Sequence, residues 1–271
     1  GEGIHDYQPQ YEAGRGALAN GGGGGDDHNS GGGGGGSFGQ GGIGGERIAS
    51  FFSCQGTAPG EGGKMLTYSN TENRVFLGGG GGCGHGNNGN SAPGEDGGGI
   101  VIIRANTIDG DGNDIFANGK NVAFNSASDG AGGGGAGGAI LLEVTNFVNS
   151  LNLSVIGGRG GNVTGTDCGG PGGGGSAGII WHSGGSLPAN VSTVLTGGGS
   201  GNTSTPASPC ANSSNGATAG DDGSTLAGLV IQESTNIGTP VNADAGADVT
   251  TCGNGTTLNA SGGVCLSLIH I

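Results

Sequence analysis

Glycine runs recur at one phase of a repeated strand pattern, and they constrain the fold of this chain more than any other feature. Of its 271 residues, 74 are glycine, with runs at 21–25, 31–36, 78–82, 132–135 and 172–175. Glycine carries no side-chain functional group and lets backbones approach closely. We therefore expect a chain built for backbone packing or spacing rather than for catalysis.

Short apolar runs alternate with the glycine runs, and the units start roughly 40 residues apart, a period typical of stacked repeats. The first run of each unit lies at 64–68, 100–103, 140–144, 179–181 and 229–231, and the second at 75–78, 115–119, 153–157 and 194–197. Both runs are short, rich in β-branched residues and bounded by Gly, Asn or Asp, which predicts strands. No amphipathic helix is indicated.

Burial of the strands can be predicted from their patterns. The run Ile100–Ile103 is apolar at every position, which predicts a strand buried on both faces. The run from Leu153 to Val155 alternates with a serine, which predicts a half-exposed strand. Trp181 follows two isoleucines, and we interpret it as a packing residue rather than as a platform for a sugar ring.

Two interpretations of the glycine runs remain open. They are either flexible linkers or ordered segments. Ordering glycine costs about 1–2 kcal/mol of backbone entropy per residue. Order would therefore require many hydrogen bonds between segments packed side by side, either extended or polyproline-II-like.

These patterns predict an all-β protein. Residues 13–238 form a glycine-rich repeat domain of short strands, either β-solenoid-like or a layered β-sandwich with long Gly-rich loops, after an N-terminal segment 1–12. Residues 239–265 read as the start of an Ig-like sandwich that is cut short. Residues 266–271 match the translated end of a transposase adapter used in sequencing libraries, and a short apolar strand is the alternative.

The charge of the chain excludes several classes of partner. It has 21 acidic and 7 basic residues, a formal net charge of −14, which repels nucleic acid and anionic membrane surfaces. No apolar run reaches the roughly 18 residues of a membrane span, so we expect no membrane insertion. An acidic surface rich in Asn, Ser and Thr suits hydrated, carbohydrate-rich partners.

The six cysteines indicate an exported, oxidised protein rather than a zinc site, because they are widely spaced and form no CxxC motif. The disulfide candidates are neighbours in sequence, Cys54 with Cys83 and Cys168 with Cys210, and each pair would close one glycine-rich loop. Six cysteines allow 15 arrangements, so other pairings remain open.

One segment resembles the first half of a calcium-binding loop, in which alternate oxygen-bearing side chains face one centre. Asp109, Asp111 and Asn113 are the candidate ligands of a structural calcium ion. The bidentate Glu that should follow is missing, and a polar turn between two strands explains the same residues. No other cofactor is indicated.

Motifs for catalysis are missing from the sequence. The histidines form no HxH or HExxH spacing, and Glu143 is the only acid inside a strongly apolar run. We therefore expect no enzyme. The alternative is an extracellular carbohydrate-active enzyme or carbohydrate-binding module on a β-helix scaffold, which would need several ionisable residues on one strand face.

The stretch 244–248, followed by Cys252 and 258–263, resembles the opening of PKD-type Ig-like repeats in large Bacteroidota surface proteins. The glycine-rich region is similar to one that such proteins carry, for example at 74–77 and 84–88. The resemblance implies type IX secretion, a gliding-motility-associated C-terminal domain, and a cell-surface or extracellular location. It also implies a structural or adhesin-like role, with extracellular matrix, carbohydrate or other surface proteins as partners and with self-association, and it supplies no catalytic residues.

Overall fold

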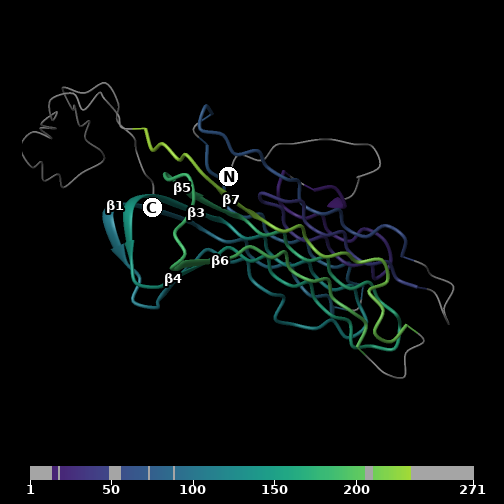
Figure 1. Cartoon of the computed structure of the whole chain (residues 1–271). Coiled ribbons are helices and arrows are strands. Elements are labelled where there is room, and N and C mark those ends of the chain that lie inside the picture. The colour runs from purple at the N-terminus through teal and green to yellow at the C-terminus, as the bar shows by residue number, and fades with distance from the viewer. Residues whose placement is uncertain are drawn as a thin grey trace, which may run out of the picture. The chain divides into compact units, whose positions relative to one another are not determined.

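The computed structural model describes residues 14–17, 19–48, 56–72, 74–87, 89–204 and 210–232 (Figure 1). The chain divides into two compact units, Gly1–Val230 and Ile231–Ile271, and almost all described residues belong to the first. The predicted segments 1–12, 239–265 and 266–271, and the boundary at 238, lie outside the described residues. The described residues contain no α-helix.

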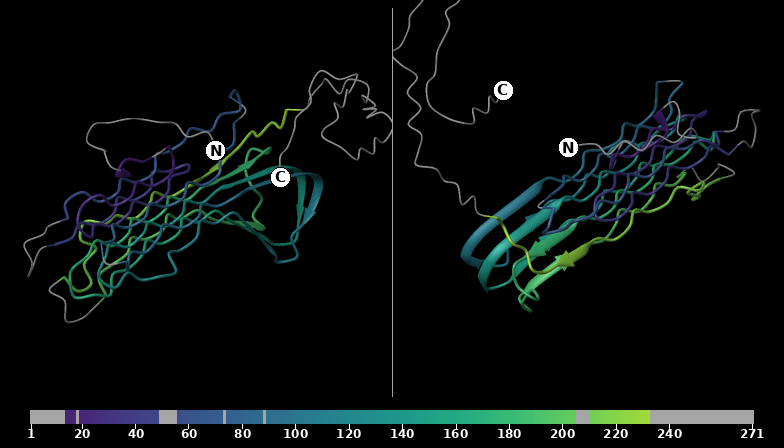
Figure 2. Two further views of the ribbon diagram at one scale, coloured as in Figure 1. Left: turned by 180° about the vertical axis from the view of Figure 1, so that it is seen from behind. Right: turned by 90° about the horizontal axis from the view of Figure 1, so that it is seen from above.

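Two parallel sheets stand at one end of the first unit (Figure 2). One has the order β1-β3-β5-β7 and the other β2-β4-β6, so three successive repeats add one strand to each sheet and the last adds β7 to the first sheet alone. This confirms a strand-rich fold, although parallel sheets are not typical of Ig-like domains. The bounds are β1 Ile100–Asp109, β2 Asp114–Phe116, β3 Ala139–Val148, β4 Leu151–Ser154, β5 Ile179–His182, β6 Val191–Val194 and β7 Ser224–Leu226.

Three predicted strands are wrong, because the runs 64–68, 75–78 and 229–231 are not in strands. Leu66 and Leu229 are buried there as single side chains, and each donates one backbone hydrogen bond, to Ser37 O and His182 O respectively. These contacts bury the apolar side chain without forming a ladder of strand pairs. The last repeat instead forms its strand a few residues earlier, at β7.

The hydrophobic core lies between the two sheets. Alternate residues of β3 and β4, from Ile140 and Leu142 to Leu151 and Leu153, pack together with Ile180 of β5. The half-exposed pattern predicted for 153–155 is confirmed from Leu151 to Ser154, where buried residues alternate with more exposed ones.

The prediction that Ile100–Ile103 is buried on both faces is wrong. Ile100 is 36% exposed and Ile102 is 58% exposed. The reason is position, because β1 is the outermost strand of its sheet. The equivalent residues of the inner strands, Leu141 of β3 and Ile179 of β5, are buried.

The glycine runs form ordered segments that pack side by side, so the expectation of long Gly-rich loops is wrong. Segment 31–36 shows the rule, since its hydrogen bonds repeat every three residues, the period of a polyproline-II helix. The N–H groups donate in turn to three neighbouring segments: Gly31 and Gly34 to 42–45, Gly32 and Gly35 to 131–134, and Gly33 and Gly36 to 20–23.

Because the residues of segment 31–36 are glycines without side chains, three further segments of the chain can pack against it. A Cβ on these glycines would lie closer than 3.0 Å to a backbone carbonyl oxygen of segment 171–174, 79–82 or 61–63. Segments 130–138 and 170–178 are enclosed in the same manner. Figure 2 shows the segments running side by side away from the sheets. Glycine is therefore required at the centre of this bundle by contact with backbone, not by flexibility.

The bundle ends on one side at residues 92–99. In segment 130–138, the Cβ positions of Gly132 and Gly135 face the carbonyls of Pro93 and Asp96. In the register that pairs Ile100 with Ala139, Pro93 and Asp96 occupy the positions equivalent to those two glycines, and both are exposed. A further segment packed there would meet their side chains, so these residues end the array.

On the outer face formed by 117–122, 155–161 and 195–202, asparagine side chains accept the backbone hydrogen bonds that a further neighbouring segment would otherwise accept. The Oδ1 atom of Asn118 accepts from the Ile156 N–H at 2.8 Å and from the Ser154 hydroxyl at 2.7 Å. Asn121 caps the Arg159 N–H at 2.7 Å and Asn162 caps the Asn202 N–H at 2.9 Å. A side chain from one repeat thus satisfies a backbone donor of the next.

We expect Asn118→Ala to lower the free energy of unfolding by about 1 kcal/mol, because it removes both hydrogen bonds to Oδ1. Thr196→Ala is the matched control, since Thr196 is exposed at the equivalent position of the fourth repeat. Urea unfolding of the two variants measures the difference. Equal midpoints would contradict the capping role of Asn118.

Candidate functional site

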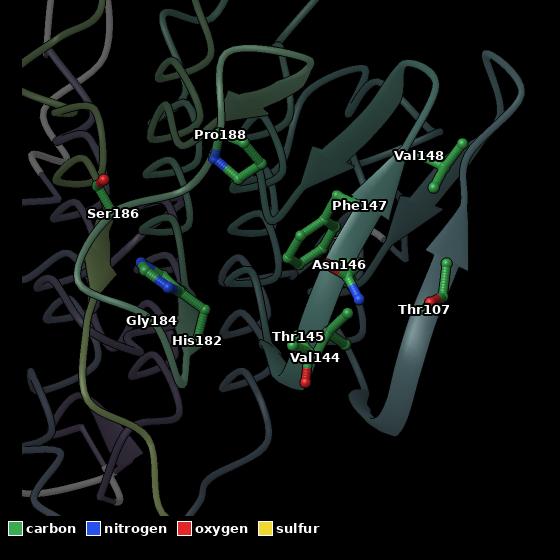
Figure 3. A pocket seen from close by; sticks show the side chains of 10 residues that line it. All are labelled: Thr107, Val144, Thr145, Asn146, Phe147, Val148, His182, Gly184, Ser186 and Pro188. Carbon is green, nitrogen blue, oxygen red and sulfur yellow. The ribbon is translucent and has the colours of Figure 1, made fainter.

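A cavity of about 610 Å³ opens where β3 continues past the end of β5. β3 runs from Ala139 to Val148, whereas β5 ends at His182 and the chain then turns away through residues 183–190. Figure 3 shows the cavity between the second half of β3 and this loop. Its lining consists of Thr107, Val144, Thr145, Asn146, Phe147, Val148, His182, Gly184, Ser186 and Pro188.

His182 is the buried polar group of this cavity. It is 4% exposed as a residue, and its ring nitrogens are not among the buried side-chain atoms of the described residues that lack a hydrogen-bond partner. Burial lowers the pKa of His182 below its ordinary value of 6.5, because desolvation disfavours the charged ring. At neutral pH the ring is therefore uncharged, with one N–H to donate and one nitrogen to accept.

The remaining polar groups of the cavity are also uncharged. Thr107, Thr145 and Ser186 supply hydroxyls, Asn146 supplies an amide, and apart from His182 none of the lining residues is acidic or basic. Phe147 adds an aromatic ring that is partly buried against the core. The cavity can thus donate and accept several hydrogen bonds but cannot neutralise a charged ligand.

The loop that closes the cavity is tied to β3. The Asn190 side chain donates to the carbonyls of Phe147 and Asn149, and the backbone N–H of Ser183 donates to Leu142 O at 3.0 Å. These bonds hold the loop at a fixed place beside the free edge of β3. The geometry is therefore set by ordered structure, which favours preorganised binding.

Sequence reasoning missed this site. The histidines were weighed there only by their spacing, and the difference in strand length between β3 and β5 leaves little trace in a short apolar run. The available signal was the stretch 183–190, which separates the first and second apolar runs of the fourth repeat.

The three candidate calcium ligands lie in the turn between β1 and β2. The Asp109 carboxylate accepts from the Asn149 side chain at 2.8 Å, and the Asn113 side chain donates to Gly110 O at 2.9 Å. Asp111 has a positive φ of 43°, as turn residues do. In the described chain no group of three His, Cys, Asp or Glu is placed to hold a metal. The calcium site stays a prediction, and the alternative interpretation of these residues as a polar turn stays open as well.

Cys168 and Cys210, one of the predicted pairs, form a disulfide. They lie at the end of the bundle away from the sheets, where segment 155–161 turns into 170–178. Cys83 has a free, exposed thiol, and its predicted partner Cys54 lies outside the described residues.

Two other sequence candidates have packing roles. Trp181 is 4% exposed and its Nε1 donates to Ala227 O at 3.1 Å, so the prediction of a packing residue is confirmed. Glu143 lies 3.0 Å from the Arg104 side chain, which forms an ion pair across β1 and β3.

A polar cluster in the glycine bundle involves two histidines, His28 and His85, whose ring centres lie 6.3 Å apart. The Nδ1 atom of His85 accepts the Asn29 N–H at 3.1 Å. Hydrogen bonds from the Thr57 and His28 backbone N–H groups hold the pKa of Asp27 below its ordinary value. These contacts, together with the hydrogen bond from Ser30 N–H to Asp27 O, hold residues 27–30 in a fixed turn and account for the cluster.

Comparisons with family models, with curated proteins and with solved structures gave no match to this chain. The likeness to PKD-type surface proteins therefore stays a resemblance of sequence. Within the described residues, no helix is long and apolar enough to cross a bilayer.

The lowered pKa of His182 predicts a pH-dependent stability. The unfolded chain takes up a proton near pH 6.5, and the folded chain does so only at lower pH. The free energy of unfolding should therefore fall as the pH drops through this interval and level off below the folded pKa. His182→Gln should remove this part of the pH dependence. Urea unfolding of both proteins across this range measures it, and identical pH profiles would contradict the prediction.

Proposed function

We propose that this chain is an extracellular structural or adhesin-like surface protein whose glycine bundle is a rigid, non-catalytic scaffold. The observation that carries the proposal is the enclosure of segments 31–36, 130–138 and 170–178 by backbone on every side. A bundle held by backbone hydrogen bonds at each turn resists bending, and it presents its sheets and loops at a fixed spacing. In this respect the stacked repeats are solenoid-like.

The chemistry of the surface supports the same proposal. The formal net charge of −14 keeps the chain hydrated and disfavours nucleic acid and anionic membranes as partners. The buried disulfide between Cys168 and Cys210 suits an oxidising, extracellular compartment. Pro93 and Asp96 oppose stacking of a second copy on that side of the bundle, so we place partner binding at the sheet end.

Adhesion of coated beads tests the proposal. Beads carrying the full chain should adhere to immobilised extracellular matrix or polysaccharide and should resist detachment by flow. Beads carrying the chain unfolded by reduction and alkylation serve as the control. Equal adhesion of both kinds of bead, or none by the folded chain to any such surface, would sink the adhesin proposal.

The alternative, a carbohydrate-active enzyme, would need ionisable groups that converge on the cavity. The residues that line it include one histidine and no carboxylate. General acid–base cleavage of a glycosidic bond ordinarily uses a pair of carboxylates. The lining therefore favours binding over cleavage.

A further inference from the structure

We infer that the cavity between β3 and the 183–190 loop binds a neutral, hydroxyl-rich ligand of the size of one or two sugar units. This inference rests on the proposed adhesin function and names the ligand class of the cavity. The volume, about 610 Å³, lies within the range of about 300–1,000 Å³ that is usual for small-molecule sites.

His182 provides the first argument. His182 is 4% exposed and lines the cavity. Its ring nitrogens are not among the buried side-chain atoms that lack a hydrogen-bond partner in the described residues, and they are therefore accessible to a ligand in the cavity. A ligand hydroxyl, which both donates and accepts, matches an uncharged imidazole that needs one of each.

The charge of the lining provides the second argument, because it excludes other ligand classes. A phosphate or carboxylate would meet no Lys or Arg among the lining residues, and it would be repelled by a chain of formal charge −14. A cation would meet no carboxylate there. The hydroxyls of Thr107, Thr145 and Ser186 and the Asn146 amide are complementary to a neutral polyol instead.

The mixture of surfaces provides the third argument. Sugar rings have an apolar face as well as hydroxyls at their rim, and Phe147, Val144 and Pro188 give the cavity apolar surface beside its polar groups. Figure 3 shows the Phe147 ring extending from β3 toward the open space, with the His182 ring on β5 turned toward the 183–190 loop. A sugar ring seated beside Phe147 would contact its apolar surface.

Titration of the full chain with single sugars tests the inference. The probes are methyl glucoside, methyl galactoside and N-acetylglucosamine, followed by NMR of the His182 imidazole resonances, with glucuronate and inorganic phosphate as anionic probes. We expect at least one neutral sugar to shift the His182 resonances in a saturable manner, and we expect neither anion to do so.

Variants locate the binding. Thr145→Val and Ser186→Ala should each weaken binding about threefold to tenfold, as the loss of one hydrogen bond does. Both residues are exposed, so folding should survive. Thr193→Val is the matched control, because Thr193 is an exposed strand residue outside the cavity. It should leave affinity unchanged, and a normal urea midpoint should accompany each variant.

Several results would overturn the inference. Failure of every neutral sugar to bind, tighter binding of an anion, or equal affinity of Thr145→Val and wild type would each do so. The bead assay separates this failure from that of the proposed function. Adhesion that persists without sugar binding at His182 would sink the cavity alone, whereas sugar binding by a chain that does not adhere would sink the adhesin role.

Discussion

Gly133→Ala is expected to destabilise this protein by about 3 kcal/mol or more, although it adds a single methyl group. Gly133 lies in the enclosed segment 130–138, and a Cβ there would come closer than 3.0 Å to Gly33 O and Gly33 C. The obstacle is backbone, which cannot rotate away as a side chain can. The neighbouring segment would have to move, and the hydrogen bond from Gly133 N–H to Gly82 O would be strained with it.

Gly199→Ala is the matched control for this substitution. Gly199 lies in the outer segment 195–202, and a Cβ there would have nothing within 4 Å. It carries no positive φ, so alanine should be accommodated and should stabilise slightly, by about 0.4–1 kcal/mol, through the unfolded state. Thermal and urea unfolding of both variants measure the contrast. Similar midpoints would show that the glycine segments do not pack as closely as described.

This contrast shows why the order of the glycine runs could not be settled from the sequence. Gly133 and Gly199 are the same residue type in similar surroundings, yet one is enclosed by backbone and the other faces solvent. Side-chain patterns distinguish the buried and exposed positions of a strand, but glycine has no side chain to report them. The deciding contacts also join distant parts of the chain, such as segment 31–36 with 131–134.

The strand positions were easier to predict because apolar side chains mark them. The runs 100–103, 140–144 and 179–181 fall within β1, β3 and β5, as the pattern predicts, whereas 115–119, 153–157 and 194–197 overlap β2, β4 and β6 only at their first one or two residues. Burial depends on whether a strand has neighbours on both sides. Leu141 is buried, whereas Ile102, in the same register on the outermost strand, is 58% exposed. A strand's rank in its sheet is a property of the assembled stack, which a local pattern does not contain.

The cavity had still less support in the sequence, because it results from a mismatch between two strands. β3 and β5 begin in register, Ala139 beside Ile179, but β5 stops at His182 while β3 continues to Val148. The buried His182, the last residue of β5, marks the point where the two strands part. A sequence shows only how far each histidine lies from other possible ligands. It does not show that His182 lies beside a cavity, which is what gives this residue its significance.

Removal of the Cys168–Cys210 disulfide is the second change with a large expected effect. The cysteines are 42 residues apart in sequence, and releasing a loop of this length costs about 4 kcal/mol in the loop-entropy model. Cys168→Ser combined with Cys210→Ser should therefore unfold at a markedly lower urea concentration. Both residues are buried, so the serine hydroxyls add a desolvation cost to the lost cross-link.

Cys83→Ser is the control for this double variant, because Cys83 has a free, exposed thiol and its loss should change the midpoint little. A reductant provides a second control, since it should destabilise the wild type by a similar amount and leave the double variant unaffected. The turns joined by the disulfide have local support: the Asn215 side chain donates to Cys168 O and Gly169 O, and the Thr203 hydroxyl donates to Cys210 O. If the double variant and the wild type unfold at the same urea concentration, these hydrogen bonds hold the end of the bundle without the cross-link.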